Sequence, residues 1–354
     1  MAKMGYVALA LVAIFCIVHV QGLSDDVEAA WEQYQAHHPS NTKSHTDAAK
    51  RKGNFVKTHE MIQKHNKNKN AAYQLEHNDF SVMDEAEKKL YTGAVAPSGS
   101  RFLIADQQLD DSMRQIPTSV IISFFQIRFI SIIIYIESKC ITSFQLDYRT
   151  NTCLAPVKNQ GSCGSCWAFT AIAPLEFAQC KKSGAKVILS EQQLVDCDPN
   201  NGGCNGGWYT TAWEYLKSGS ARQSAYSYTA VKGTCKFSTS TIGSKVATYG
   251  SVTSKSPSSM QAALVRYGPL SVAITVINSF YSYKSGVYTD AACDNKGVNH
   301  GVVVVGWGNL SGVDYWIVRN SWGSGWGSSG YILMQRGVNK CSIETYPAAV
   351  ASVV

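Results

Sequence analysis

The cysteines constrain this chain more than any other feature of its sequence. There are eleven in 354 residues, and the first, Cys16, lies in an apolar run from Tyr6 to Val20. Lys3 before that run and "VQG" after it are typical of a cleaved signal peptide, which we assign to residues 1–22. The run is short for a membrane span, so a membrane anchor is the weaker interpretation. The other ten cysteines would then fold in an oxidising compartment, where cysteines pair.

Composition and charge describe an ordinary globular protein with two unlike halves. Hydrophobic residues make up 45% of the chain and charged residues 16%. Residues 23–115 carry 12 Lys and Arg against 14 Asp and Glu, whereas residues 147–354 carry 17 against 10. Basic residues do not cluster with interleaved aromatic residues, so we expect no binding of nucleic acid.

The pattern along the chain predicts a mixed α+β protein. Residues 25–90 have few glycines and carry apolar positions at helical spacing, which indicates helices. The small-residue stretch "TGAVAPSGS", residues 92–100, is typical of a linker. The back half predicts one helix beginning near Cys166 and ending at Gly184. It also predicts strands at Leu270–Val276, His300–Gly308 and Asp314–Asn320.

Two cysteines in "NQGSCGSCWAF", Cys163 and Cys166, allow three interpretations. A zinc site would add Cys197 and Cys204, but the gap between these two is wider than such sites use. A redox dithiol would need a preceding strand in a small βαβ domain, and that pattern is not clear here. The third interpretation is one structural cysteine beside one reactive cysteine. The dipole of the predicted helix favours a thiolate at Cys166, in its first turn.

A reactive thiolate needs a histidine as its proton partner and a third group that orients the histidine. The back half contains a single histidine, His300, 134 residues after Cys166. Asn320 follows in "RNSWGSGWG", 154 residues after the same cysteine. Cysteine, histidine and asparagine at these intervals, together with "CGSCW", match the signature of papain and the cathepsins.

At these residues the chain resembles the papain-like cysteine peptidases of the cathepsin L-like branch, from about Trp31 to the C-terminus. The motifs "PVKNQGSCGSCWAF", "CNGGW", "VNHGVVVVGWG" and "YWIVRNSWGSGWGSSGY" occur together and in order. The resemblance implies a papain-like two-domain peptidase over residues 116–354. Its left domain would be helical, at about 147–254, and its right domain antiparallel and β-barrel-like, at about 255–354. A helical inhibitory propeptide, residues 23–115, would precede it.

The resemblance also implies a role for each residue of the catalytic site. Cys166 would be the nucleophile, His300 the general acid and base, and Asn320 the acceptor that fixes the imidazole. Gln160 and the Cys166 N–H would stabilise the oxyanion, and Trp322 would shield the hydrogen bond between Asn320 and His300 from water. A catalytically silent homologue that acts as an inhibitor or binding protein is the rival class. The intact polar residues of the site argue against it.

Substrate contacts follow from the same resemblance. The backbone of Gly206 and Gly207 would pair with substrate in antiparallel fashion, and Trp208 and Tyr209 would flank the S3 and S2 subsites. The other residues expected around an apolar, roomy S2 subsite are Ala273, Val298 and Gly301, with Tyr346 as the final wall. We therefore expect endopeptidase action with a bulky apolar P2 residue.

The family pattern implies three disulfides: Cys163–Cys204, Cys197–Cys235 and Cys293–Cys341. Cys153 and Cys180 are left over in the peptidase domain. We predict that they form a fourth disulfide, which would tie the first strand to the end of the catalytic helix. The alternative is a pair of buried free thiols.

The resemblance implies a set of partners but no cofactor and no metal. The expected partners are peptide and protein substrates, the chain's own propeptide and cystatin-type inhibitors, with no nucleic acid and no membrane. We expect a monomer that is lysosomal, endosomal or secreted. The one N-glycosylation sequon, "NLS" at Asn309, is expected on an exposed turn between two strands.

The front half resembles the family's inhibitory propeptide, although several positions of the family's motifs carry other residues here. The residues that fit its spaced helical motifs are Asp47, Arg51, Phe55, Ile62, Asn66, Asn78 and Phe80. Six of the eight histidines lie in this acidic half, at positions 37, 38, 45, 59, 65 and 77. Because histidine titrates near pH 6.5, their protonation would reverse the charge of the propeptide. We therefore expect release in an acidic compartment, with histidines that have no role as the alternative.

The segment Val120–Gln145 does not belong to the family pattern, since it separates "IPTS" from "LDYR". A membrane span is disfavoured by Gln126 and Arg128 near its centre. An inserted strand pair would suit its β-branched content but would invite aggregation. The third hypothesis is a retained intron in the gene model: its removal would keep the reading frame and leave a family-like mature start. Cys140 would then be absent from the working protein.

Overall fold

The computed structural model describes residues 25–41, 47–97 and 145–354. These residues form two compact units. Unit 1 contains the described residues up to Ala71 together with Leu75–Ala86, and unit 2 contains Ala72–Gln74 with the described residues from Glu87 to Val354. The expected signal peptide and all of the suspected insert except Gln145 lie outside the described residues. Within those ranges, no helix has both the length and the apolar character needed to cross a membrane.

Unit 1 is largely helical, as its sequence predicts. Residues 25–37 form a helix, followed by a 3₁₀ turn η1 (Pro39–Asn41), helix α2 (Ala48–Asn66) and a second 3₁₀ turn η2 (Asp79–Val82). Helix α3 (Glu85–Lys89) begins in unit 1 and ends in unit 2. A small core forms where Trp31 and Tyr34 of the first helix pack against Phe55 of α2 and Val82 of η2.

Several residues of the worn propeptide motif fix the loops of unit 1. The Asn66 side chain accepts from Leu75 N at 3.0 Å and donates to Leu75 O at 2.8 Å, which mimics a strand pairing at the end of α2. The Asn78 side chain accepts from Phe80 N at 3.0 Å and caps η2. Asn66 thus ties the end of α2 to Leu75, and Asn78 fixes the start of η2.

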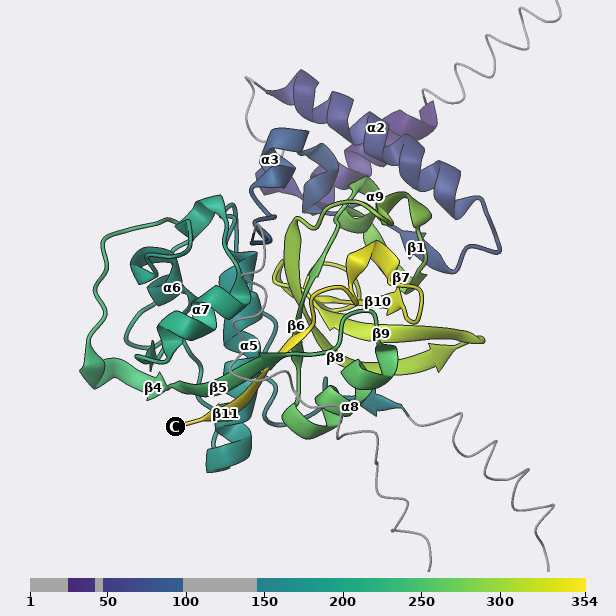
Figure 1. The fold of residues 1–354 in the computed structure, drawn as a ribbon. Helices are drawn as coiled ribbons and strands as arrows, with labels where there is room; N and C mark the ends of the chain where they lie inside the picture. The colour runs from purple at the N-terminus through teal and green to yellow at the C-terminus, as the bar shows by residue number, and fades with distance from the viewer. Residues whose placement is uncertain (1–24, 42–46, 98–144) are drawn as a thin grey trace, which may run out of the picture. The chain divides into compact units, whose positions relative to one another are not determined.

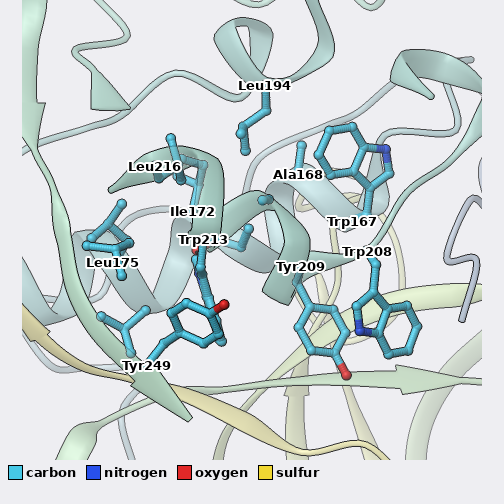
Figure 2. Packing of buried hydrophobic residues seen from close by; sticks show 14 of the residues in the cluster. Trp167, Ala168, Ile172, Leu175, Leu194, Trp208, Tyr209, Trp213, Leu216 and Tyr249 are labelled. Carbon is cyan, nitrogen blue, oxygen red and sulfur yellow. The ribbon is translucent and has the colours of Figure 1, made fainter. Parts of the chain in front are cut away.

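The helices of unit 2 are α5 (Cys166–Ser183), α6 (Glu191–Cys197), α7 (Tyr209–Leu216), α8 (Pro257–Tyr267) and α9 (Asn278–Tyr281). Helices α5, α6 and α7 share one apolar cluster (Figure 2). Helix α5 begins and ends as the sequence predicts, because Gly184 stops it with a left-handed φ of 73°. Trp167, Ile172 and Leu175 of α5 face Trp213 and Leu216 of α7 across this cluster.

A nine-stranded sheet forms the other part of unit 2 (Figure 1). Its strands are β1 (Tyr73–Leu75), β2 (Leu146–Asp147), β5 (Val246–Ser251), β6 (Leu270–Ile274), β7 (Tyr283–Tyr288), β8 (His300–Leu310), β9 (Val313–Arg319), β10 (Tyr331–Gln335) and β11 (Ala348–Val353). Their order is β1-β7-β10-β9-β8-β6-β11-β5, with β2 beside β8. Strands β3 (Ser220–Ala221) and β4 (Ile242–Ser244) form a separate pair.

The pairing within this sheet departs from the sequence-based picture in two respects. Strand β10 pairs with β7 in parallel, whereas the resemblance predicts antiparallel strands. Strands also cross the expected domain boundary near residue 254: β2 pairs with β8, and the C-terminal β11 pairs with β5. These crossings tie the two expected domains together by backbone hydrogen bonds.

Helix α5 continues through Pro174, which lies in its middle. A proline has no N–H to donate to the carbonyl four residues earlier, here that of Thr170. The Ser271 hydroxyl of β6 donates to Thr170 O at 2.7 Å instead. Both side chains are buried, so the donor that the helix loses is supplied by the neighbouring strand.

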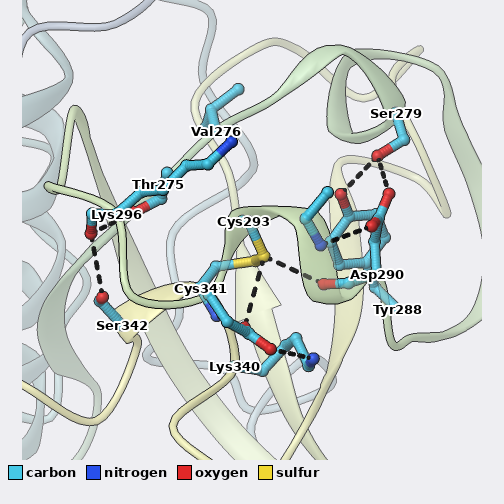
Figure 3. The surroundings of a disulfide bond; sticks show 12 residues. Thr275, Val276, Ser279, Tyr288, Asp290, Cys293, Lys296, Lys340, Cys341 and Ser342 are labelled. Atoms are coloured by element: carbon cyan, nitrogen blue, oxygen red, sulfur yellow. Dashed lines mark hydrogen bonds and ion pairs between the residues drawn. A yellow bond between two sulfur atoms is a disulfide. The ribbon is translucent and has the colours of Figure 1, made fainter.

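Four disulfides connect the loops of unit 2: Cys153–Cys180, Cys163–Cys204, Cys197–Cys235 and Cys293–Cys341. Figure 3 shows the last of these, which joins η8 (Ala291–Cys293) to η9 (Lys340–Ser342). Among the described cysteines, Cys166 alone is free. The zinc interpretation fails, because Cys163 and Cys197 are oxidised in two different bridges.

Candidate active site

Cys166 is the first residue of α5 and is completely buried. Gly301, the second residue of β8, donates its N–H to Cys166 Sγ at 3.3 Å. The α5·β8 packing therefore brings the thiol to the start of the strand that begins with His300. Residues 135 positions apart in the sequence meet here, as the motif spacing predicts.

His300 and Asn320 lie on neighbouring strands. Strand β8 begins with His300, and Asn320 follows the last residue of β9, its antiparallel partner. His300 Nε2 donates to Asn320 Oδ1 at 2.8 Å, and that oxygen also accepts from Ser321 N at 2.8 Å. The Trp322 ring lies 4.8 Å from the imidazole, between centroids, and covers this hydrogen bond. The other imidazole nitrogen, Nδ1, is buried and has no hydrogen-bond partner among the described residues.

Burial keeps the cysteine and the histidine uncharged in this structure. It raises the pKa of the Cys166 thiol to about 12, which the N–H of Gly301 only partly offsets. It also lowers the pKa of His300 to about 4, against the effect of the Asn320 hydrogen bond. Burial beneath the covering segment therefore disfavours a thiolate–imidazolium pair.

Residues 91–95 of unit 2 lie over this site, and we call this segment the cover. Gln160 Nε2 donates to Tyr91 O at 3.2 Å and to Cys163 O at 2.9 Å. Trp322 Nε1 donates to the same Tyr91 carbonyl at 3.0 Å. The Gln160 side chain is fixed from behind, because the Ser321 hydroxyl donates to its Oε1 at 2.6 Å. A carbonyl of the chain itself thus occupies the donor that the sequence assigns to the oxyanion.

Beyond Tyr91 the cover lies along the predicted substrate-binding glycines. Gly207 N donates to Gly93 O at 2.9 Å, and Val95 N donates to Gly207 O at 3.1 Å, which makes a parallel bridge. Gly206 has a φ of 111°, and a Cβ on it would lie 2.7 Å from Gly93 O. Only glycine leaves room for a strand at this distance.

The predicted S2 residues also come together. Ala94 is buried in the apolar cluster that contains Cys166, Trp208, Tyr209 and Ala273, and Val298 and Tyr346 pack against the same cluster. Gly301 lies close against Thr170, because a Cβ on Gly301 would be 2.7 Å from Thr170 Oγ1. The Tyr209 hydroxyl donates to the Tyr346 carbonyl.

Sequence reasoning missed the cover itself. It described residues 92–100 as a linker, yet Thr92, Gly93 and Ala94 begin that stretch and lie against the site. Asn299, which precedes His300, accepts at its carbonyl from the N–H groups of both Gly93 and Ala94. The available signal was the run of small residues, which lets a backbone approach another backbone closely.

Sequence reasoning also missed a buried charge cluster. Lys158 Nζ lies 2.8 Å from Glu176 Oε1 and 2.6 Å from Glu191 Oε1. These three residues line a cavity together with Asn320. Burial raises the pKa of Glu191, partly offset by the charge of Lys158. Lys158 is two residues from Gln160, so the cluster anchors the segment that carries the predicted oxyanion donor.

Two family models match this chain. The model described as "Papain family cysteine protease" matches residues 142–351, which is more than half of the chain and includes Cys166, His300 and Asn320. The model described as "Cathepsin propeptide inhibitor domain (I29)" matches residues 31–87.

Curated relatives resemble part of the chain. Thiol protease aleurain of Arabidopsis thaliana is 45% identical over 205 residues, which cover 56% of this chain and 57% of the relative. Cathepsin S of Bos taurus is 43% identical over 210 residues, which cover 57% of this chain and 63% of the relative. The chain thus spans less than two thirds of the length of these relatives.

Solved structures resemble nearly the whole chain. The structure of digestive procathepsin L2 proteinase from Tenebrio molitor larval midgut has a TM-score of 0.77 and 30% identity, covering 91% of this chain and 99% of that one. Recombinant stem bromelain precursor has a TM-score of 0.74 and 30% identity, with 92% and 99% covered. The expected α+β fold with a helical N-terminal region is confirmed by these matches.

Proposed function

Because this chain belongs to the papain family of cysteine proteases, we propose that it is a cysteine endopeptidase made as a self-inhibited zymogen. One observation carries the proposal. The free thiol of Cys166 and the pair formed by His300 and Asn320 are buried together beneath a carbonyl of the same chain, which is bound by Gln160. An inactive binding protein would not need this set of groups.

Catalysis begins once the cover has left. The Cys166 thiol passes its proton to His300, and the thiolate attacks the scissile carbonyl carbon. The resulting oxyanion accepts hydrogen bonds from Gln160 Nε2 and from the Cys166 N–H. His300 then protonates the leaving amine, the C–N bond breaks, and an acyl-enzyme remains on Cys166.

Hydrolysis of the acyl-enzyme completes the reaction. His300 takes a proton from water, whose oxygen attacks the thioester carbonyl. The C–S bond breaks, the peptide leaves as a carboxylic acid, and the proton returns to the Cys166 sulfur. Asn320 holds the imidazole in one orientation throughout, and Trp322 keeps water from their hydrogen bond.

Substrate would lie along Gly206 and Gly207 in the direction opposite to the cover, with an apolar P2 residue. The Ala94–Gly207 bridge is parallel, whereas a substrate strand would be antiparallel. A cover that runs in reverse places Tyr91 O on Gln160 without offering a scissile bond in the productive direction. The reversed direction explains how a segment of the chain can fill the site without being cleaved.

The wider assignment follows from the same proposal. Its partners are peptide and protein substrates, the chain's own propeptide and cystatin-type inhibitors, and the enzyme acts as a monomer, lysosomal or endosomal or secreted. The similarity to digestive cysteine proteinase 1 of Homarus americanus, 43% identical over 210 residues, supports a secreted role. Asn309, exposed near the end of β8, is the proposed glycosylation site.

The test is labelling with an epoxide probe for thiol proteases. The zymogen should label weakly at pH 7 and strongly after activation at acidic pH, with the label on Cys166 in peptide mapping. A Cys166→Ala variant is the matched control and should not label. Activated protein that neither labels nor cleaves a protein substrate would contradict the proposal.

A further inference from the structure

A tyrosine hydroxyl lies between the two segments of the chain that carry the expected oxyanion donors. Tyr228 Oη donates to the backbone carbonyl of Gln160 at 2.7 Å. The same oxygen lies 2.6 Å from the hydroxyl of Ser165. The Gln160 side chain is one expected donor, and the peptide group that joins Ser165 to Cys166 carries the other. One atom of a distant loop therefore contacts both segments.

The direction of these hydrogen bonds follows from the groups involved. A carbonyl oxygen can only accept, so the single proton of the Tyr228 hydroxyl goes to Gln160 O. The Ser165 hydroxyl must then donate to Tyr228, and its other contact, with Cys163 O, is longer at 3.4 Å. Burial raises the pKa of Tyr228 above its usual range, so this hydroxyl keeps its proton at neutral and acidic pH.

Ser165 gives up a common role in order to make this contact. It is the N-cap of α5, a position at which a serine side chain usually accepts from a backbone N–H of the first turn. Ser190 does so at the start of α6, where it accepts from Gln193 N at 3.1 Å. The Ser165 side chain makes no such bond, although it is completely buried. Its hydroxyl serves Tyr228 instead of the helix.

The tyrosine itself is held from two sides. Its ring meets the ring of Phe169 edge to face, with 5.0 Å between centroids and 81° between planes. Phe169 belongs to the first turn of α5, three residues after Cys166. The next residue of the loop, Thr229, donates its N–H to Gln192 Oε1 of α6 at 2.8 Å. The hydroxyl is therefore fixed in space relative to the start of α5.

Resting on the proposed function, we propose that Tyr228 is a positioning residue for the oxyanion site. Its hydroxyl holds the Gln160 and Cys166 segments at the separation at which both donors point to the same oxygen. Two donors stabilise one developing charge only when both are aligned with it, and a small misalignment lowers the rate. Tyr228 acts through the Gln160 carbonyl and the Ser165 hydroxyl rather than on the substrate.

The experiment measures steady-state kinetics of Tyr228→Phe on a blocked fluorogenic peptide that the native enzyme cleaves. The enzyme is activated and its active sites are titrated with an epoxide, so unfolded protein does not enter kcat. We expect kcat to fall by about 10-fold with KM changed little, less than the about 10²–10³-fold for the loss of a whole donor.

Tyr226→Phe is the matched control in the same loop. The Tyr226 hydroxyl donates to Asp196 at 2.8 Å and accepts from Lys236 N at 3.0 Å, so this variant also loses two hydrogen bonds. These bonds tie the loop to α6 and to its own end, not to Gln160 or Ser165. Tyr226→Phe should therefore keep the native kcat.

Two further measurements separate positioning from a general structural role. The rate at which the epoxide alkylates Cys166 should stay close to native in Tyr228→Phe, because alkylation forms no oxyanion. In a Gln160→Ala background the same change should cost about 2-fold or less, since only one donor is left to align. Ser165→Ala should lower kcat as Tyr228→Phe does, and should add little to it in the double variant.

Each outcome decides the inference. A native kcat in Tyr228→Phe, or an equal loss in the Gln160→Ala background, overturns it and leaves the proposed peptidase activity standing. A raised KM with an unchanged kcat overturns it too, because it assigns Tyr228 to ground-state binding. Native enzyme that neither labels with the epoxide nor cleaves any peptide overturns both proposals. If Tyr228→Phe does not fold, the kinetics of Ser165→Ala decide.

Discussion

At the scale of single residues, Gln160 is the most informative position. Its amide is held between Cys163 O, Tyr91 O and the Ser321 hydroxyl, so the donor is oriented before any substrate arrives. Pre-oriented donors contribute most to stabilising the charge that develops in a transition state.

We expect Gln160→Ala to lower kcat by about 10²–10³-fold, with KM changed little, as for the loss of one oxyanion donor. Steady-state kinetics on the activated enzyme measures this. The alkylation rate of Cys166 by an epoxide serves as the internal control and should change much less, since alkylation forms no tetrahedral oxyanion. A raised KM with an unchanged kcat would instead assign Gln160 to ground-state binding.

At the scale of elements, one hydroxyl forms a buried hydrogen bond between β6 and α5. Pro174 cannot donate to Thr170 O, and Ser271 donates to it from β6 at 2.7 Å. The catalytic helix and the strand that carries Ala273 are therefore joined through a carbonyl that an ordinary helix would use internally.

We predict that Ser271→Ala destabilises the protein by about 1–3 kcal/mol, because a buried carbonyl loses its donor. Urea denaturation of the inactive Cys166→Ala zymogen measures the change. In a Pro174→Ala background the helix regains an N–H for Thr170 O, so the same serine change should cost clearly less. Equal costs in the two backgrounds would refute the coupling.

Unit 1 contains two histidines, His59 and His77, whose rings are in direct contact. His59 Nδ1 on α2 lies 3.0 Å from His77 Nε2, and the rings stack with 9° between their planes. Phe55 stacks on His77 at 4.3 Å between centroids, and His77 Nδ1 contacts the Ser81 hydroxyl at 3.0 Å. If both rings were protonated, two N–H groups would point at each other inside this core.

The pKa values of this pair predict loss of unit 1 in acid. Burial lowers the pKa of His77 to about 4, with the charges of His59 and His38 acting in the same direction. Burial also lowers the pKa of His59, against the attraction of Asp26 and Glu60. Below pH 6.5 the unfolded segment binds more protons than the folded one, so the free energy of unfolding falls as the pH drops toward about 4.

We therefore expect the double change His59→Gln and His77→Gln to lower the pH of autoactivation, because the variant no longer binds extra protons at these two positions when unit 1 unfolds. Hydrogen exchange of the α2 amides in the Cys166→Ala zymogen, followed from pH 7 to 4, reports the same transition directly. His37→Gln is the control, because His37 is exposed and lies outside the pair. An unchanged activation profile in the double variant would leave the histidines without this role.

At the scale of the whole molecule, the first question is whether the mature protein contains residues 120–145. The family match begins at residue 142, and the propeptide match ends at residue 87. The suspected insert, Val120–Gln145, lies almost wholly between these limits.

We predict that tryptic mapping of purified active enzyme yields no peptide containing "FISIIIYIESK", because the retained-intron hypothesis removes this segment from the mature transcript. Thiol counting on the denatured, unreduced enzyme should then find one free cysteine, Cys166, with Cys153 and Cys180 oxidised as in the structure. Detection of that peptide in active enzyme would end the insert hypothesis. A count of three thiols would contradict the fourth disulfide.

The sequence by itself determined the parts of this protein that depend on local pattern or on fixed motif spacing. Helix α5 ends at Ser183 because the glycine that follows it, Gly184, is a local stop signal. The meeting of Cys166, His300 and Asn320 followed from the resemblance, since these three residues keep their spacing on a shared fold.

Only the tertiary structure decided what fills the site. Neither the hydrogen bond from Gln160 to Tyr91 O nor that from Ala94 N to Asn299 O is specified by a local pattern, because both join residues about 70 or more positions apart. The same holds for Ser271 and Thr170, which are 101 positions apart. Such contacts are set by packing and by the satisfaction of buried polar groups, and these exist only once the chain has folded.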